Sequence, residues 1–217
     1  MDTLIQTLAI AALPVIFAIT LHEAAHGYAA RHFGDLTAWQ AGRISLNPLR
    51  HIDLIGTVVV PFSILLLSSG NFLFGWAKPV PVNFGNLRNP KKDMFWVAAA
   101  GPGANLFMAL LWAGVLKLVE AAPDNVYSMP MARMADVGID INLVLMALNQ
   151  LPLPPLDGGR IAVSLLPHRL AWNFARIEPW GFPILLLLLF TGILSSILGP
   201  VIGLLRLLVA ALFNFQY

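Results

Sequence analysis

Long apolar stretches, separated by shorter polar connections, dominate the chain. They cover residues 4–33, 54–67, 94–119, 137–151, 182–198 and 201–213. A helix needs about 20 mostly apolar residues to cross the hydrocarbon core of a bilayer. The stretch at 54–67 is too short for a full crossing and is interrupted by Gly56 and Pro61. The pattern predicts an all-α polytopic membrane protein with about five transmembrane helices.

The composition excludes an ordinary soluble protein. Hydrophobic residues make up 58% of the chain and charged residues 11%, whereas soluble domains carry about 25% charged residues. The net charge of +2 is too small to indicate a nucleic-acid partner. No Lys or Arg precedes the first apolar stretch, so we expect that stretch to be retained as a helix rather than removed as a signal peptide.

The basic residues predict the orientation in the bilayer, because Lys and Arg gather in cytoplasmic connections. They lie on either side of residues 54–67 and again after residue 151: Arg31, Arg43, Arg50, Lys78, Arg88, Lys91, Lys92, Arg160, Arg169 and Arg176. A re-entrant helix at 54–67 keeps these connections on one side, with the chain returning in extended form through residues 71–78. We therefore predict an external N-terminus and place the ends of 4–33 and 137–151 near the cytoplasm.

Candidate chemistry begins with an HExxH motif in the first apolar stretch, from His22 through Glu23 to His26. Residues four apart on a helix advance about 400°, so the two histidines project from one face. Such groups are costly at bilayer depth and indicate function. A hydrolytic zinc ion takes three protein ligands and one water, whose proton a neighbouring Glu can accept. The motif predicts one Zn²⁺ ion.

Two residues compete to be the third ligand, since the chain has no Cys. His32 follows in the spacing of HExxHxxGxxH metalloproteases, but Ala29 stands where that pattern needs a helix-breaking Gly. If the helix continues, His32 lies about 15 Å of rise from His22, too far to share an ion. Asp157 is the better candidate, because the prolines before it and the glycines after it unwind the chain and free its carboxylate to turn toward a metal.

Three motifs together give the chain a resemblance to a known family. They are HEAAH at 22–26, AGPGAN at 100–105 and NQLPLPPLDGG at 149–159. The chain resembles the site-2 protease family of intramembrane zinc metalloproteases, in its short prokaryotic branch without PDZ or CBS domains. That branch also carries sequences like GRISLNPLRHID and FGWAKPVPVN, found here at 42–53 and 74–83.

The resemblance implies a role for each matching residue. It implies zinc bound by His22, His26 and Asp157, with Glu23 as the catalytic base. It also implies that Asn149 lies near the metal and steadies the substrate or the tetrahedral intermediate. The substrate implied is a transmembrane helix of another protein in the lipid bilayer of a prokaryotic cell, cleaved within or near the membrane.

We therefore expect a zinc metalloendopeptidase with its active site nearer the cytoplasmic side. Short β segments are predicted near the active site. Residues 1–217 would form one membrane-embedded protease domain, with a catalytic core at about 1–160 and a C-terminal helical hairpin at about 180–213 that turns at Gly199-Pro200. Two alternatives belong to other classes: an intramembrane metal-ion transporter, and an inactive scaffold that retains the protease fold. The intact Glu23 argues against the scaffold.

Other polar and small residues in these regions have structural explanations. Asn105 and Asn142 are predicted to join helices by hydrogen bonds or to take part in catalysis. Gly101 and Gly103 are predicted to permit close helix packing. His51 is predicted to be solvated in its polar loop rather than to carry protons.

Overall fold

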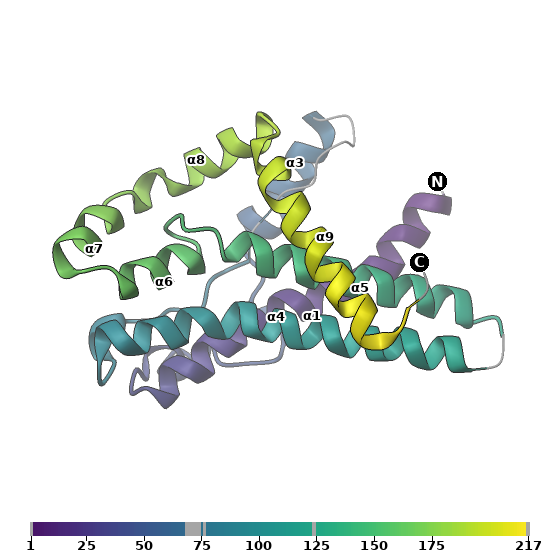
Figure 1. Cartoon of the computed structure of the whole chain (residues 1–217), viewed down its shortest axis with the longest axis horizontal. Coiled ribbons are helices and arrows are strands. Elements are labelled where there is room, and N and C mark those ends of the chain that lie inside the picture. The colour runs from purple at the N-terminus through teal and green to yellow at the C-terminus, as the bar shows by residue number, and fades with distance from the viewer. Residues whose placement is uncertain (1, 68–74, 76, 123–124, 216–217) are drawn as a thin grey trace.

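The computed structural model describes residues 2–67, 75, 77–122 and 125–215, and every regular element in these residues is a helix (Figure 1). In chain order they are α1 (Asp2–His32), α2 (Thr37–Gln40), η1 (Pro48–Arg50), η2 (Leu54–Val59), α3 (Val60–Leu67), η3 (Phe84–Asn86), α4 (Pro90–Ala121), α5 (Ser128–Asn149), α6 (Asp157–Leu165), α7 (His168–Ala175), α8 (Glu178–Phe190) and α9 (Ile193–Phe213).

Helices α1, α4 and α5 pack against one another and form the centre of the molecule, and α9 crosses α5 and α4 (Figure 1). The largest buried cluster lies where α4, α5 and α9 meet and includes Trp112, Ile139, Leu143 and Val209. Gly138 on α5 lies so close to Trp112 of α4 that a Cβ at that position would overlap the indole ring. Small residues at helix contacts are typical of membrane proteins, where they let backbones approach closely.

Three helices in the described part of the chain are long and apolar enough to cross a membrane: Gln6–His32, Pro90–Ala121 and Ile193–Phe213. Helices α7 and α8 meet at 61° and together make one further broken span or re-entrant loop. Helix α5 is not among these candidates and carries Arg133, Asp136 and Asp140. Arg206 of α9 contacts both aspartates. The helices agree with an all-α membrane protein, while the expected number of about five spans is not confirmed.

The apolar stretches match the helices closely in the first half of the chain. Residues 4–33 and 94–119 correspond to α1 and α4, and 54–67 corresponds to the continuous pair η2 and α3. The side chain of Asp53 accepts a hydrogen bond from the backbone N–H of Gly56 at 2.7 Å, which explains why η2 begins there. Residues 68–74 and 76 lie outside the described residues, and with them most of the predicted return of the re-entrant segment.

The turn of the C-terminal hairpin lies seven residues before the predicted one at Gly199-Pro200. Helix α9 runs from Ile193 to Phe213 without a break and includes Pro200. The chain turns at Gly192, whose φ of 75° is in the left-handed region that glycine adopts without a steric penalty. Pro is tolerated in membrane helices because neighbouring groups satisfy the carbonyl that it leaves unbonded. The prediction of a helix end at Gly199-Pro200 was therefore wrong.

The predicted short β segments do not occur among the described residues. The chain from Ala77 to Asn83 is extended, but its backbone bonds to loops and side chains rather than to a strand. The N–H of Lys78 donates to the carbonyl of His51 at 2.9 Å. The N–H groups of Val80 and Asn83 donate to the carboxylates of Glu23 and Asp35, each at 2.7 Å. The segment from Ala77 to Asn83 therefore does not form a β-sheet with any described residue.

Candidate metal centre

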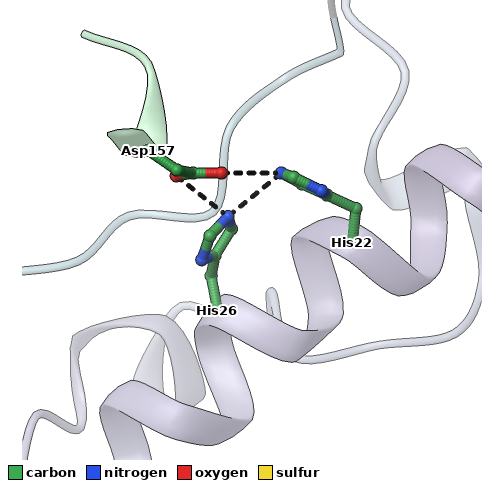
Figure 2. Close-up of side chains that lie close together, drawn as sticks. All are labelled: His22, His26 and Asp157. Atoms are coloured by element: carbon green, nitrogen blue, oxygen red, sulfur yellow. Dashed lines mark hydrogen bonds and ion pairs between the residues drawn. The ribbon is translucent and has the colours of Figure 1, made fainter. Parts of the chain in front are cut away.

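The two histidines of the HExxH motif face the same point from one side of α1 (Figure 2). His22 and His26 lie one helical turn apart, and their Nε2 atoms are 3.1 Å from each other. The opposite ring nitrogens are both engaged in hydrogen bonds, His22 Nδ1 with Asn105 Oδ1 at 2.6 Å and His26 Nδ1 with the carbonyl of Val97 at 2.7 Å. Both Nε2 atoms are therefore the nitrogens left to bind a ligand.

Asp157 completes the group from a distant part of the sequence. Its Oδ2 lies 3.3 Å from Nε2 of His22, and its Oδ1 lies 3.3 Å from Nε2 of His26 (Figure 2). Asp157 is the first residue of α6, where a carboxylate interacts favourably with the positive end of the helix dipole. The residue is buried, with 8% of its surface exposed.

The chain before Asp157 is irregular, as its prolines predict, but the glycines after it do not unwind the chain. Gly158 and Gly159 belong to α6. Their role is close approach: a Cβ on Gly158 would lie 2.5 Å from the carbonyl oxygen of Leu151, and one on Gly159 would lie 2.5 Å from the carbonyl carbon of Leu153. The first turn of α6 packs directly on the chain that leaves α5, and this packing positions Asp157.

The donor atoms of this group fit a zinc ion. Two ligands of a tetrahedral zinc ion, each about 2.0–2.1 Å from it, stand about 3.3 Å apart. The two Nε2 atoms are 3.1 Å apart, and each lies 3.3 Å from a different oxygen of Asp157, which is close to that value. With one ligand atom taken from each residue, the three atoms lie within 4.8 Å of one another. Asp157 Oδ2 is buried without a hydrogen-bond partner among the described residues, as an atom reserved for a metal would be. Two imidazoles and one carboxylate are also the ligand set of several hydrolytic zinc sites.

Helix α4 approaches the histidines at Gly101. A Cβ there would overlap Nε2 of His26 and would lie 2.6 Å from Cε1 of His22. The absence of a side chain at residue 101 lets α4 lie against the pair, which brings the carbonyl of Val97 and the amide of Asn105 to their Nδ1 atoms. The close packing predicted for Gly101 thus occurs at the metal centre itself.

Comparison with known proteins identifies the family. A Bacillus subtilis protein named Putative zinc metalloprotease YwhC is 38% identical to the chain over 199 residues, which cover 88% of this chain and 84% of that protein. The chain belongs to the site-2 protease family. This agrees with the family indicated by the three sequence motifs.

Mycobacterial members of the site-2 protease family match more distantly. A Mycolicibacterium smegmatis protein named Putative zinc metalloprotease Rip2 is 31% identical over 181 residues, 83% of this chain and 66% of that protein. Its Mycobacterium tuberculosis namesake is 29% identical over 153 residues, 70% of this chain and 54% of that protein. No family model and no solved structure matches the chain. The names of these relatives support a metalloprotease role.

The Glu of the family's HExxH motif is held by the extended segment. Glu23 is half-buried on α1, and its Oε2 accepts a hydrogen bond from the N–H of Val80 at 2.7 Å. The segment that carries Val80 is in turn bound by Arg43, whose Nη2 donates to the carbonyl of Lys78 at 2.8 Å. A loop far from α1 in sequence therefore orients the carboxylate next to the histidine pair.

Two other candidate residues, Asn149 and His32, lie outside the group formed by His22, His26 and Asp157. Asn149 ends α5, and its amide donates to the carbonyl of Leu145 in its own helix at 3.0 Å, not to any of the three converging residues in the described chain. His32 is exposed at the end of α1 with its ring against Phe33, outside the cluster, as the helical rise predicts.

His51 is not solvated, so this prediction was wrong. It is 2% exposed, and its Nε2 lies 2.8 Å from the carbonyl of Ser45. The polar composition of its loop suggested exposure, but His51 bonds within the loop to Ser45 and, through its carbonyl, to the N–H of Lys78.

The contact of Asn105 with His22 was not predicted, because the sequence indicated only that this amide joins helices by hydrogen bonds or takes part in catalysis. The signal was present: a single amide within an apolar helix, four residues after Gly101. Nothing in the sequence alone indicated which side chain that amide meets. The contributions of the Val97 carbonyl and the Val80 N–H have no sequence signal, because every non-proline residue carries both groups.

Proposed function

We propose that the chain is an intramembrane zinc metalloendopeptidase that cleaves peptide bonds within or near transmembrane helices of other membrane proteins. The observation that carries the proposal is the convergence of His22, His26 and Asp157 on one point beside an apolar helix, with Glu23 next to His22. In the described residues this is the one such group of three metal-binding side chains. Family membership supports the same chemistry.

Each residue has a defined task in this reaction. His22, His26 and Asp157 would hold one Zn²⁺ ion, which would act as a Lewis acid toward the peptide carbonyl and would lower the pKa of a water molecule. Glu23 accepts the proton of the attacking water on its carboxylate and delivers it to the nitrogen of the leaving amine. The hydrogen bond from Val80 keeps the Glu23 carboxylate in one orientation. Asn149 is proposed to steady the substrate or the tetrahedral intermediate, for which its oxygen and its second N–H hydrogen are available while it donates to the carbonyl of Leu145.

The proposed substrate is a transmembrane helix that unwinds before cleavage, since the hydrogen bonds of a helix shield its carbonyls. An unwound strand can pair with the extended segment that contains Val80 and Val82. Because the N–H of Val80 is bonded to Glu23, Val82→Pro tests strand pairing more cleanly than a change at Val80. We expect this variant to retain zinc and to cleave more slowly. Unchanged cleavage would contradict the pairing.

The proposed topology places the N-terminus outside and the metal centre nearer the cytoplasm. The basic connections support this orientation. About five crossings would include α5, whose charged residues Asp136 and Asp140 contact Arg206 within the helix bundle. A reporter fused before residue 1 should be accessible from outside the cell, and labelling from the cytoplasm alone would overturn the orientation.

Glu23→Gln is the main test of the function. The substitution keeps the size of the side chain and removes the proton acceptor, and it leaves the three proposed ligands in place. We expect the purified variant to contain as much zinc as the wild type and to cleave no substrate. In cells, membrane-protein fragments that accumulate only with the variant identify the substrates. Normal cleavage by Glu23→Gln would exclude this residue as the base.

A further inference from the structure

The two histidines of the metal centre are held by different kinds of partner. His26 Nδ1 lies 2.7 Å from the carbonyl of Val97. A carbonyl only accepts hydrogen bonds, so His26 carries its proton on Nδ1. His22 Nδ1 instead lies 2.6 Å from the side-chain amide of Asn105. An amide can present either an acceptor oxygen or a donor nitrogen, so this contact alone does not determine where the proton of His22 resides.

Backbone carbonyls remove this ambiguity in two steps. The nitrogen of the Asn142 amide faces the carbonyl of Gly138 at 2.8 Å, which leaves its Oδ1 to face Asn105. The Asn105 nitrogen then donates both of its hydrogens, one to Asn142 Oδ1 at 3.0 Å and one to the carbonyl of Ala18 at 3.2 Å. A flipped Asn105 would place its oxygen against two acceptors. Its Oδ1 must therefore face His22.

We propose that Asn105 is a positioning residue for the metal centre: it holds His22 with the proton on Nδ1 and the lone pair of Nε2 directed at the metal. The inference rests on the proposed function only in naming a metal as the ligand of that lone pair. Helix α4 thereby supports both histidines, through a backbone group for His26 and through a replaceable side chain for His22. Partners of this kind typically change metal affinity by about 10- to 100-fold.

Burial makes this arrangement rigid. Asn105 and Asn142 are both 0% exposed, and they link α1, α4 and α5 at one level of the bundle. Each donor and acceptor of Asn105 has a partner, so a rotation of its amide would break three hydrogen bonds at once. In an apolar interior no water replaces them. The His22 ring is therefore held in one orientation by Asn105.

Two substitutions of Asn105 separate positioning from packing. Asn105→Leu fills a similar volume and removes the acceptor for His22, while Asn105→Asp keeps an acceptor and removes the amide donors. We expect Asn105→Leu to bind Zn²⁺ about 10- to 100-fold more weakly in a chelator competition and Asn105→Asp to bind more tightly than Asn105→Leu. Asn142→Ala is the matched control, since Asn142 touches Asn105 but not His22. It should lower thermal stability and weaken zinc binding less than Asn105→Leu, because the carbonyl of Ala18 still orients the Asn105 amide.

A second measurement needs no substrate. Nitrogen chemical shifts of the His22 ring in the detergent-solubilised, zinc-loaded protein report which nitrogen carries the proton and which faces the metal. We expect a protonated Nδ1 in the wild type and in Asn142→Ala, and a mixture of both forms in Asn105→Leu. The inference is overturned if Nε2 carries the proton in the wild type, or if Asn142→Ala weakens zinc binding as much as Asn105→Leu. A wild type that binds zinc but cleaves nothing would refute the proposed function and leave this inference standing.

Discussion

Gly101 lies against His26 so closely that a methyl group at its Cα would overlap the Nε2 atom of the ring. The same methyl would lie 2.6 Å from Cε1 of His22. Any residue other than glycine at position 101 would carry a Cβ that pushes the two proposed ligands out of position. Gly103, two residues later on the same helix, has no atom within 4 Å of its hypothetical Cβ. The two glycines of one motif thus have different roles.

This difference predicts opposite outcomes for two alanine substitutions. Gly101→Ala should displace the histidines at a cost of about 1–3 kcal/mol, typical of overpacking, and should lower zinc affinity by about tenfold or more. Gly103→Ala should leave zinc affinity unchanged. Metal analysis of the two purified variants after chelator competition provides the comparison. Equal zinc binding by both would show that residue 101 does not constrain the site.

The choice between Asp157 and His32 as third ligand gives the second prediction. The Asp157 carboxylate lies 3.3 Å from both histidine Nε2 atoms, whereas His32 is exposed at the end of α1. Asp157→Ala removes one of three donors and should yield protein with little bound zinc, while His32→Ala should retain the wild-type amount. Metal content per mole of folded protein measures both. Zinc loss in His32→Ala alone would reverse the assignment.

The helices and the two histidine ligands were predictable from the sequence because both depend on local signals. The apolar stretch at 4–33 predicts α1, and HExxH on a helix requires its histidines to share a face. The approach of Asp157 was predicted from a global constraint: the charges in the connections predict that the helices before Gly34 and before Pro152 end on the same side of the bilayer.

The supporting contacts were not predictable because they depend on packing between distant segments. Asn105 meets His22 across 83 residues of sequence, and Val80 meets Glu23 across 57. The turn at Gly192 was missed for another reason. Gly199-Pro200 carries the stronger local signal for a helix end, yet α9 continues through it and a left-handed glycine ends α8 seven residues earlier.

The pH dependence of stability provides a prediction outside the membrane helices. Asp35 is fully buried in the loop after α1. Burial acts to raise its pKa, but hydrogen bonds from Thr37, Asn83 and Asn86 outweigh burial and hold the pKa below its ordinary value. The folded state therefore binds this proton less readily than the unfolded chain. Asp35 stabilises the fold above the unfolded pKa of about 3.9, and this contribution is lost as the pH falls through the lower folded pKa.

Asp35→Asn tests whether the charged Asp35 carboxylate stabilises the fold at neutral pH. At neutral pH the substitution should lower the free energy of unfolding by about 1–3 kcal/mol, because donors that faced a carboxylate lose an acceptor. The difference between the two proteins should shrink as the pH falls below about 4. Thermal unfolding of both metal-free proteins in detergent gives the comparison without a contribution from zinc release. A difference that stays constant over this range would assign the effect to shape rather than charge.

The last prediction concerns the loop that orients Glu23. Arg43 donates to the carbonyls of Lys78 and Pro79 at 2.8 and 3.4 Å and so sets the position of the next residue, Val80, whose N–H bonds Glu23. Arg43→Ala should let this segment shift. Because small misplacements at a catalytic group are costly, we expect cleavage to slow by roughly 10- to 100-fold, while zinc content stays at the wild-type level.

Arg50→Ala is the matched control for this loop. Arg50 carries the same charge and donates to the carbonyl of Gly42 within its own loop, away from the segment that contains Val80. Both variants lose one positive charge from the connection between α1 and η2, so an effect on membrane insertion would appear in both. We expect kcat to fall only in Arg43→Ala. Equal losses of kcat in the two variants would show that the effect comes from the lost charge or from membrane insertion. A loss of zinc in Arg43→Ala would show that the loop supports the zinc ligands rather than Glu23.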